Sequence, residues 1–240
     1  MKRRRLDSAK LERYMRYFFI ILTIGAIIYN IYVTEWEILF AAVLTLVLIL
    51  MPTLLARRAR ISIPSGFQIF ILLFVFASMY LGEVHGYFHR FRWWDRLLHS
   101  TSAVVLGYIG FVLIYALNKD SRMEVKLSPL FMALFSFCFA VTIGTLWEIF
   151  EFGADALVGA NMQKARNLEL IYGSLDTRLG LLDTMVDLIV NVIGALFVSI
   201  LGYFHVKYFK DNDTAFWNLH RQFITENPEL FGLEDEQPQS

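Results

Sequence analysis

Long apolar segments dominate this chain and constrain its fold more than any other feature. Six of them reach the length of about 20 residues that a helix needs to cross the hydrocarbon core of a bilayer. We place them roughly at 17–33, 36–55, 66–82, 96–116, 127–150 and 182–206. The short alternating segments of a β-barrel are absent from the sequence. With 57% hydrophobic and 18% charged residues, the chain is predicted to be an all-α, polytopic transmembrane helical bundle.

The distribution of Lys and Arg predicts the orientation of these helices. Basic residues are concentrated in the N-terminus, in the loops 56–65 and 117–126, and after the last span. Because an excess of Lys and Arg marks cytoplasmic loops, both termini are expected in the cytoplasm of a bacterial cell, with the spans in its cytoplasmic membrane. This division gives a basic N-terminus at 1–16, a transmembrane domain at 17–206 and a polar tail at 207–240.

Acidic and histidine side chains gather at the opposite, outer side. Asp95 and His99 open the fourth span, Glu148 and Glu151 end the fifth, and Asp183, Asp187 and Asn191 open the sixth. Within each set the residues are three or four apart, so each set lies on one face of its helix. Because ionisable groups in membrane segments normally face a cavity or a partner, we expect these three faces to meet at one site.

Two structural explanations compete with a functional one. Asp95 and Asp183 lie where helices are expected to start, and Asp is a preferred N-cap. Glu148 and Glu151 lie at an expected helix C-terminus, where the dipole disfavours negative charge. Salt bridges to the arginines of the 84–96 connection, Arg90, Arg92 and Arg96, would compensate for it.

A divalent cation is the other way to compensate for so many acids. Carboxylates with imidazole suit zinc, manganese or iron, whereas carboxylates alone suit magnesium or calcium. We therefore predict a metal site with Glu148, Asp187 and His99 as catalytic candidates and His85, His89 and Asn191 as secondary candidates. The predicted metal ligands are Asp95, His99, Glu148, Glu151, Asp183 and Asp187. A proton shared among the acids, as in proton-coupled carriers, is the alternative.

Several motifs resemble known bacterial families. The segments WWDRLLHSTSA, WEIFEFGAD, NMQ and LLDTMVDLIVNVIGAL resemble the YjdF-like family of inner-membrane proteins of unknown function, over roughly residues 65–205. The order of Asp187, Asn191 and Gly194 is also similar to the VanZ-like membrane proteins, which are linked to teicoplanin tolerance by an unclear mechanism. These resemblances imply a fold and a set of site residues, and neither implies a known reaction.

The sequence leaves three functions open. The first is a metal-dependent hydrolase or transferase acting on a lipid or cell-envelope precursor, with one carboxylate activating bound water. The second is a cation or proton carrier or an envelope-binding protein, and the third is a structural protein whose acids pair with arginine. Membrane lipids are expected partners; with zero net charge and no basic domain, nucleic acid is not. The outer connection 156–181 either covers the site, with Asn161 and Gln163 reaching into it, or is a solvated connector.

Overall fold

The computed structural model describes residues 2–91, 93–119, 126–164, 178–208 and 215–231, and the described residues contain helices and no strand. Six helical segments are long and apolar enough to cross a membrane, which confirms the predicted bundle. They are α1 (Lys2–Val33), α2 (Trp36–Ala59), α3 (Ser65–Val75) with its continuation η1 (Phe76–Val84), α5 (Trp94–Lys119), α6 (Pro129–Val158) and α8 (Leu179–Tyr208). Three shorter helices are α4 (Tyr87–Arg90), α9 (Ala215–Glu226) and η2 (Pro228–Phe231).

Two helix boundaries differ from the predicted spans in ways that matter for the site. The fifth span does not end near residue 150, because α6 continues to Val158 and is terminated by Gly159 in the left-handed conformation, with φ 75°. The third span changes at residue 76 from an α-helix to a π-helix, a wider winding that is frequent near functional sites. Glu148 is therefore an interior residue of α6 and lies well outside its last turn.

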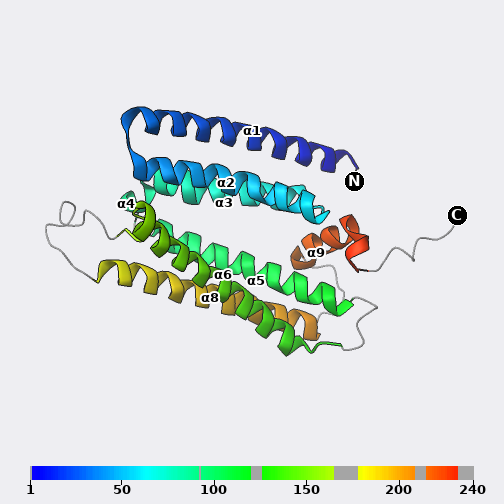
Figure 1. Cartoon of the computed structure of the whole chain (residues 1–240). Coiled ribbons are helices and arrows are strands. Elements are labelled where there is room, and N and C mark those ends of the chain that lie inside the picture. The colour runs from blue at the N-terminus through cyan, green and yellow to red at the C-terminus, as the bar shows by residue number, and fades with distance from the viewer. Residues whose placement is uncertain (1, 92, 120–125, 165–177, 209–214, 232–240) are drawn as a thin grey trace.

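The long helices form two layers (Figure 1). The helices α1, α2 and α3 make up one layer, and α5, α6 and α8 make up the other. The N-terminus and α9 lie at one end of the molecule, and α4 lies at the opposite end. Six antiparallel crossings therefore return the described chain to the side of the N-terminus, where α9 lies; that this side is the cytoplasm stays a prediction.

The second layer packs closely because small residues allow its helices to approach. A Cβ on Gly194 of α8 would stand 2.9 Å from the carbonyl oxygen of Ser100 on α5, and one on Gly107 would overlap Val198. Small residues in such positions are the usual way to bring helices together in lipid. Ser136 of α6 adds a hydrogen bond, since its hydroxyl donates to the carbonyl of Gly107 at 2.6 Å.

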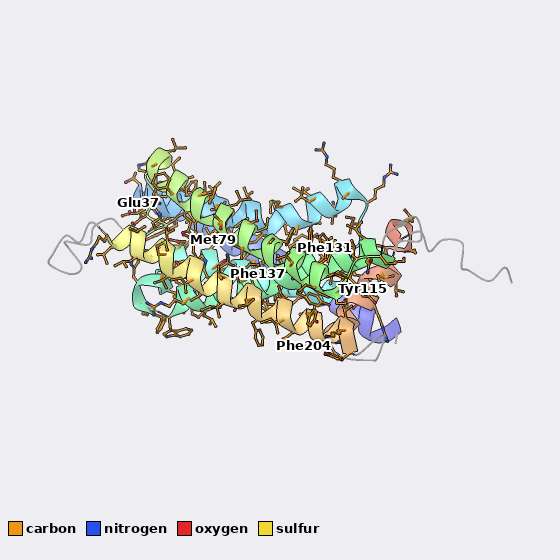
Figure 2. The ribbon with its side chains drawn as sticks, turned by 90° about the horizontal axis from the view of Figure 1, so that it is seen from below. Glu37, Met79, Tyr115, Phe131, Phe137 and Phe204 are labelled. Carbon is orange, nitrogen blue, oxygen red and sulfur yellow. The ribbon has the colours of Figure 1, made fainter. Side chains whose placement is uncertain are left out.

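The first layer has an apolar interior. Phe19 of α1 stacks on Phe76 of η1 with ring centroids 4.4 Å apart, and Ile49 and Met79 are buried beside them. Outside the bundle, many large apolar side chains are exposed, such as Phe204, which is 47% exposed and projects from α8 in Figure 2. A surface of this kind suits contact with lipid tails.

The C-terminal segment packs onto the bundle at the end where the termini lie. It contains the short helix α9, whose sequence is AFWNLHRQFITE. Asn227 anchors it by accepting a hydrogen bond from the backbone N–H of Ser62 at 2.6 Å and donating one to the Ser62 carbonyl at 2.8 Å. The described part of the predicted polar tail is thus fastened to the loop between α2 and α3.

Candidate functional site

The acidic residues lie together at the end of the bundle opposite the termini. The first turns of α5, the second half of α6 and the first half of α8 bring them there, and Lys164 of the connector after α6 contacts Asp95 and Asp183. We call this group the acidic cluster; its members are Asp95, His99, Glu148, Glu151, Asp183 and Asp187. Apart from His99 and Asp183, which are partly buried, its members are buried.

His99 is the centre of the cluster. Its Nε2 atom lies 3.6 Å from Oδ1 of Asp95 and 3.9 Å from Oδ2 of Asp187. Its Nδ1 atom lies 3.6 Å from Oε1 of Glu148. One imidazole from α5 therefore faces carboxylates contributed by α5, α6 and α8, as the single-faced spacing predicted.

Three of these side chains meet the distance requirement for a shared metal ion. One oxygen of Asp95, one of Asp187 and one ring nitrogen of His99 all lie within 4.8 Å of one another. Glu148 faces the other ring nitrogen, which is the position from which a carboxylate orients a metal-binding histidine. Asp95, His99 and Asp187 are therefore the candidate metal ligands, and Glu148 is a candidate for orienting His99. From the sequence, all four are predicted metal ligands.

Three buried side chains in this region, those of Glu148, Glu151 and Asn191, have polar atoms without a hydrogen bond of ordinary geometry among the described residues. They include both carboxylate oxygens of Glu148, which is 5% exposed and faces the Thr184 hydroxyl of α8. The amide of Asn191, which is 2% exposed, lies against Gly144 of α6. Buried polar groups are normally hydrogen-bonded, so the Glu148 oxygen that faces His99 is a sign of a ligand position.

Lys164 supplies a positive charge that the sequence did not lead us to expect here. Its ammonium group lies 2.7 Å from Oδ2 of Asp95, 3.6 Å from Oδ2 of Asp183 and 4.4 Å from the centre of the Phe88 ring. Burial alone would lower the pKa of Lys164, but the carboxylates of Asp95 and Asp183 outweigh it and hold the pKa well above its ordinary value. Lys164 is therefore a fixed cation.

The connector after α6 is folded onto the bundle as far as Lys164. The Asp155 carboxylate accepts hydrogen bonds from the backbone N–H groups of Met162, at 2.7 Å, and Gln163, at 3.0 Å. The Gln163 side chain donates to the Thr184 hydroxyl of α8 at 2.9 Å. Lys164 then takes a positive φ of 52°, which directs the chain so that its ammonium reaches Asp95. This first part is not the solvated connector considered above, and residues 165–177 lie outside the described residues.

The remaining members of the cluster have local partners. Glu151 accepts a hydrogen bond from the indole of Trp147 at 2.8 Å, and Asp183 pairs with Lys164. Asp183 is not an N-cap, because α8 begins four residues earlier at Leu179, and Asp95 is the second residue of α5. The capping explanation is therefore wrong for Asp183.

The secondary histidines and the arginines do not join the cluster. His85 and His89 are exposed, and the His85 ring packs against Tyr80 with centroids 4.8 Å apart. Arg90 and Arg96 are exposed as well, and no ion pair between them and Glu148 or Glu151 occurs in the described part of the chain. Arg92 lies outside the described residues. The expected arginine partner is thus replaced by Lys164, which pairs with Asp95 and Asp183.

An apolar cavity opens from the cluster toward the first layer. It has a volume of about 350 Å³ and lies between α3, η1 and the first half of α5. Asp95, His99 and Glu151 line its polar end, and Phe70, Phe74 and Leu106 are among the apolar residues that line the rest. A site with convergent polar groups and an apolar pocket has the composition of a small-molecule binding site.

Comparisons with known proteins place the chain in a family without an assigned reaction. An uncharacterised protein of Thermotoga maritima is 26% identical over 155 residues, which cover 65% of this chain and 68% of that protein. No solved structure matches. The YjdF-like name from the sequence is compatible with these findings and stays a resemblance. The sequence model of the DUF2238 family, described as a predicted membrane protein, matches residues 14–208, and the chain belongs to this family.

Proposed function

We propose that the acidic cluster binds a divalent metal ion and that the protein is a metal-dependent hydrolase or transferase acting on a lipid or cell-envelope precursor. The observation that carries this proposal is the position of His99, whose two ring nitrogens face carboxylates from three helices. Asp95, His99 and Asp187 would hold the metal, and carboxylate with imidazole suits zinc or manganese. Magnesium would depend on the carboxylates alone.

The charges at this end support a cation. The described acids of the cluster have Lys164 as their ammonium partner, and that ammonium is already paired with Asp95 and Asp183. Asp187 faces the same ring nitrogen of His99 as Asp95, and Glu148 faces the other; neither Asp187 nor Glu148 has an ion pair with lysine or arginine in the described ranges. Buried carboxylates without compensation are costly, so this side of the cluster requires a positive ion or bound protons.

In the proposed reaction, the metal would supply a polarised water or substrate oxygen. Glu148 would fix the ring and tautomer of His99 through its Nδ1 atom. A carboxylate oxygen of Asp187 or Asp95 that is not bound to metal would accept the proton from attacking water. The outer-leaflet position of this chemistry rests on the predicted orientation of the helices.

Metal content of the purified full-length protein tests the proposal. Wild type is expected to retain about one divalent ion per chain after dialysis against zinc or manganese, and Asp187→Asn and Glu148→Gln are expected to retain far less. Glu37→Gln is the matched control, because Glu37 is exposed on α2 and lies toward the same end of the molecule (Figure 2). Absence of bound metal in wild type, or an equal loss of metal in the Glu37→Gln control, would contradict the proposed metal-dependent activity.

A carrier of cations or protons is the second candidate, and the same cluster would serve it. The observation that favours it is the fixed ammonium of Lys164, which already compensates part of the acid charge without a metal. A metal-free wild type that takes up protons or cations into sealed vesicles, and loses this uptake in Asp187→Asn, would favour the carrier.

A further inference from the structure

A crevice runs along the bundle between its two layers, beginning at the acidic cluster. The 350 Å³ cavity, lined on α5 from Asp95 to Ile109, forms most of it. A hollow of about 450 Å³ lies beside the far part of this cavity, toward α8, and another of about 100 Å³ lies beyond it, lined on α5 from Tyr108 to Leu113. Phe67 of α3 lines all three, and Val105 and Ile109 of α5 each line two of them. These shared side chains are the walls between the cavity and the two adjoining hollows.

The 350 Å³ cavity is long enough for one lipid tail. Its wall on α5 extends from Asp95 to Ile109, and a helix rises 1.5 Å per residue, so the cavity is roughly 21 Å long. One alkyl chain spans one leaflet, about half of the roughly 30 Å hydrocarbon core, so the cavity can hold such a chain. Phe223 of the anchored C-terminal helix α9 lines the 100 Å³ hollow, which lies farthest from the cluster.

Polarity changes along the crevice from one end to the other. Asp95, His99 and Glu151 line the end at the cluster, whereas the two farther hollows are lined by apolar side chains, backbone glycine and Tyr108. An occupant with one charged or polar end and a long apolar body fits this gradient, and a lipid is the molecule of that kind that a membrane supplies.

The charge at the polar end selects among lipid heads. The ammonium of Lys164 lies against Asp95 and Asp183 and over the ring of Phe88. Aromatic rings attract cations, so this end of the crevice suits positively charged groups. The cluster around it is acidic, so an anionic head without a positive group would be repelled.

We propose that this crevice binds a long-chain lipid, with one alkyl chain between α3 and α5 and an ammonium-bearing head at the acidic cluster. The inference rests on the proposed function, for which it supplies the substrate class. It differs from ordinary contact with surrounding lipid because the cavity lies between the layers and ends at His99.

Native mass spectrometry of the purified full-length protein tests the proposal with two probes of equal chain length, phosphatidylethanolamine and phosphatidylglycerol. We expect one retained lipid per chain and at least about fivefold preference for phosphatidylethanolamine. Val105→Trp fills the crevice and is expected to lower retention about tenfold. Leu117→Trp adds the same bulk to the exposed face of α5 and is expected to leave retention unchanged.

The outcomes separate this inference from the proposed function. Equal retention by the two tryptophan variants, or preference for phosphatidylglycerol, overturns the lipid inference even where metal binds as expected. If wild type binds no metal and Val105→Trp alone loses the retained lipid, the lipid site is supported and the metal-dependent reaction is ruled out. If Val105→Trp does not fold, Ile109→Phe makes the same comparison, because Ile109 also lines two of the hollows.

Discussion

The two layers of the bundle treat buried polar side chains differently. In the first layer, Thr23, Asn30 and Thr45 donate hydrogen bonds to carbonyls one turn earlier in their own helices. In the second layer, buried polar groups face other helices, and those of Glu148 and Asn191 remain unpaired among the described residues. A hydrogen bond within the same helix costs that helix little, so these three side chains need no partner on a neighbouring helix. Arg16 is an exception in the first layer, because it donates a hydrogen bond from α1 to Gln68 of α3 at 2.6 Å.

This difference indicates which layer is shaped by function. Unsatisfied buried atoms lower stability, and proteins retain such features chiefly where activity requires them. The second layer contains the acidic cluster, and the first layer supplies the far wall of the crevice. The following predictions test this division, beginning with the largest expected effect.

Removal of the positive charge on Lys164 should destabilise the second layer most. Lys164→Met leaves Asp95 and Asp183 buried without their cation, which is expected to cost about 3–5 kcal/mol of unfolding free energy. Added zinc or manganese should restore more stability to this variant than to wild type, because the ion replaces the lost charge. Thermal unfolding in detergent measures both effects.

Lys10→Met is the control for this prediction, since Lys10 is exposed on α1. It should unfold as wild type does, with or without metal. A Lys164→Met protein as stable as the control would show that the cluster is already neutral without the lysine.

The same glycine substitution should have opposite effects in the two layers. Gly194→Ala places a Cβ 2.9 Å from the Ser100 carbonyl and 3.0 Å from Ala103, so α5 and α8 must separate, at a cost of about 1–3 kcal/mol. Gly25→Ala in α1 meets no atom within 4 Å and should be neutral or stabilise by up to about 1 kcal/mol, because alanine favours the helix. Equal unfolding temperatures for the two variants would contradict the close packing of the second layer.

Removal of the unpaired charge at Glu148 should raise stability while metal binding falls. Glu148→Gln keeps the shape of the side chain and removes a buried negative charge that has no ion pair with lysine or arginine among the described residues, so the metal-free protein should gain about 1–2 kcal/mol. Unfolding with a chelator present measures this gain, and adding metal should reverse the order of the two proteins. A loss of stability in the metal-free variant would mean that Glu148 has a structural partner.

Residue spacing was sufficient to predict the helices and much of the cluster. Asp95 with His99, and Asp187 with Asn191, are four residues apart on faces that the structure does turn inward. Lys164 could not be placed in this way, because its position depends on the turn that Asp155 holds and on a left-handed backbone conformation at the lysine itself.

The end of α6 and the winding of η1 were also beyond the sequence pattern. The predicted span ends at residue 150, yet the helix continues through Gly153 to Val158, and Asp155 then binds the turn that follows. The π-helix at 76–84 has no signature in its apolar residues; the indole of Trp94, 17 positions later, donates to the Ala77 carbonyl within it at 3.1 Å. Neither contact can be derived from the hydrophobic pattern.

The smallest expected change in unfolding free energy comes from removing one buried hydroxyl in each layer. This comparison distinguishes the two layers most directly, because the two hydroxyls are equally buried. Thr45 on α2 and Ser136 on α6 are both fully buried, but Thr45 donates to Ala41 in its own helix and Ser136 donates to Gly107 on α5. Thr45→Val keeps the side-chain shape and leaves a carbonyl that is already bonded within the helix, so its unfolding free energy should change by less than about 0.5 kcal/mol. Ser136→Ala removes an interhelical hydrogen bond, which in membranes is worth about 0.6 and at most about 1.7 kcal/mol, and it also deprives the Ser199 hydroxyl of its acceptor. If unfolding in detergent showed the larger loss for Thr45→Val, polar groups in the first layer would be contributing between helices, and the contrast between the layers would not hold.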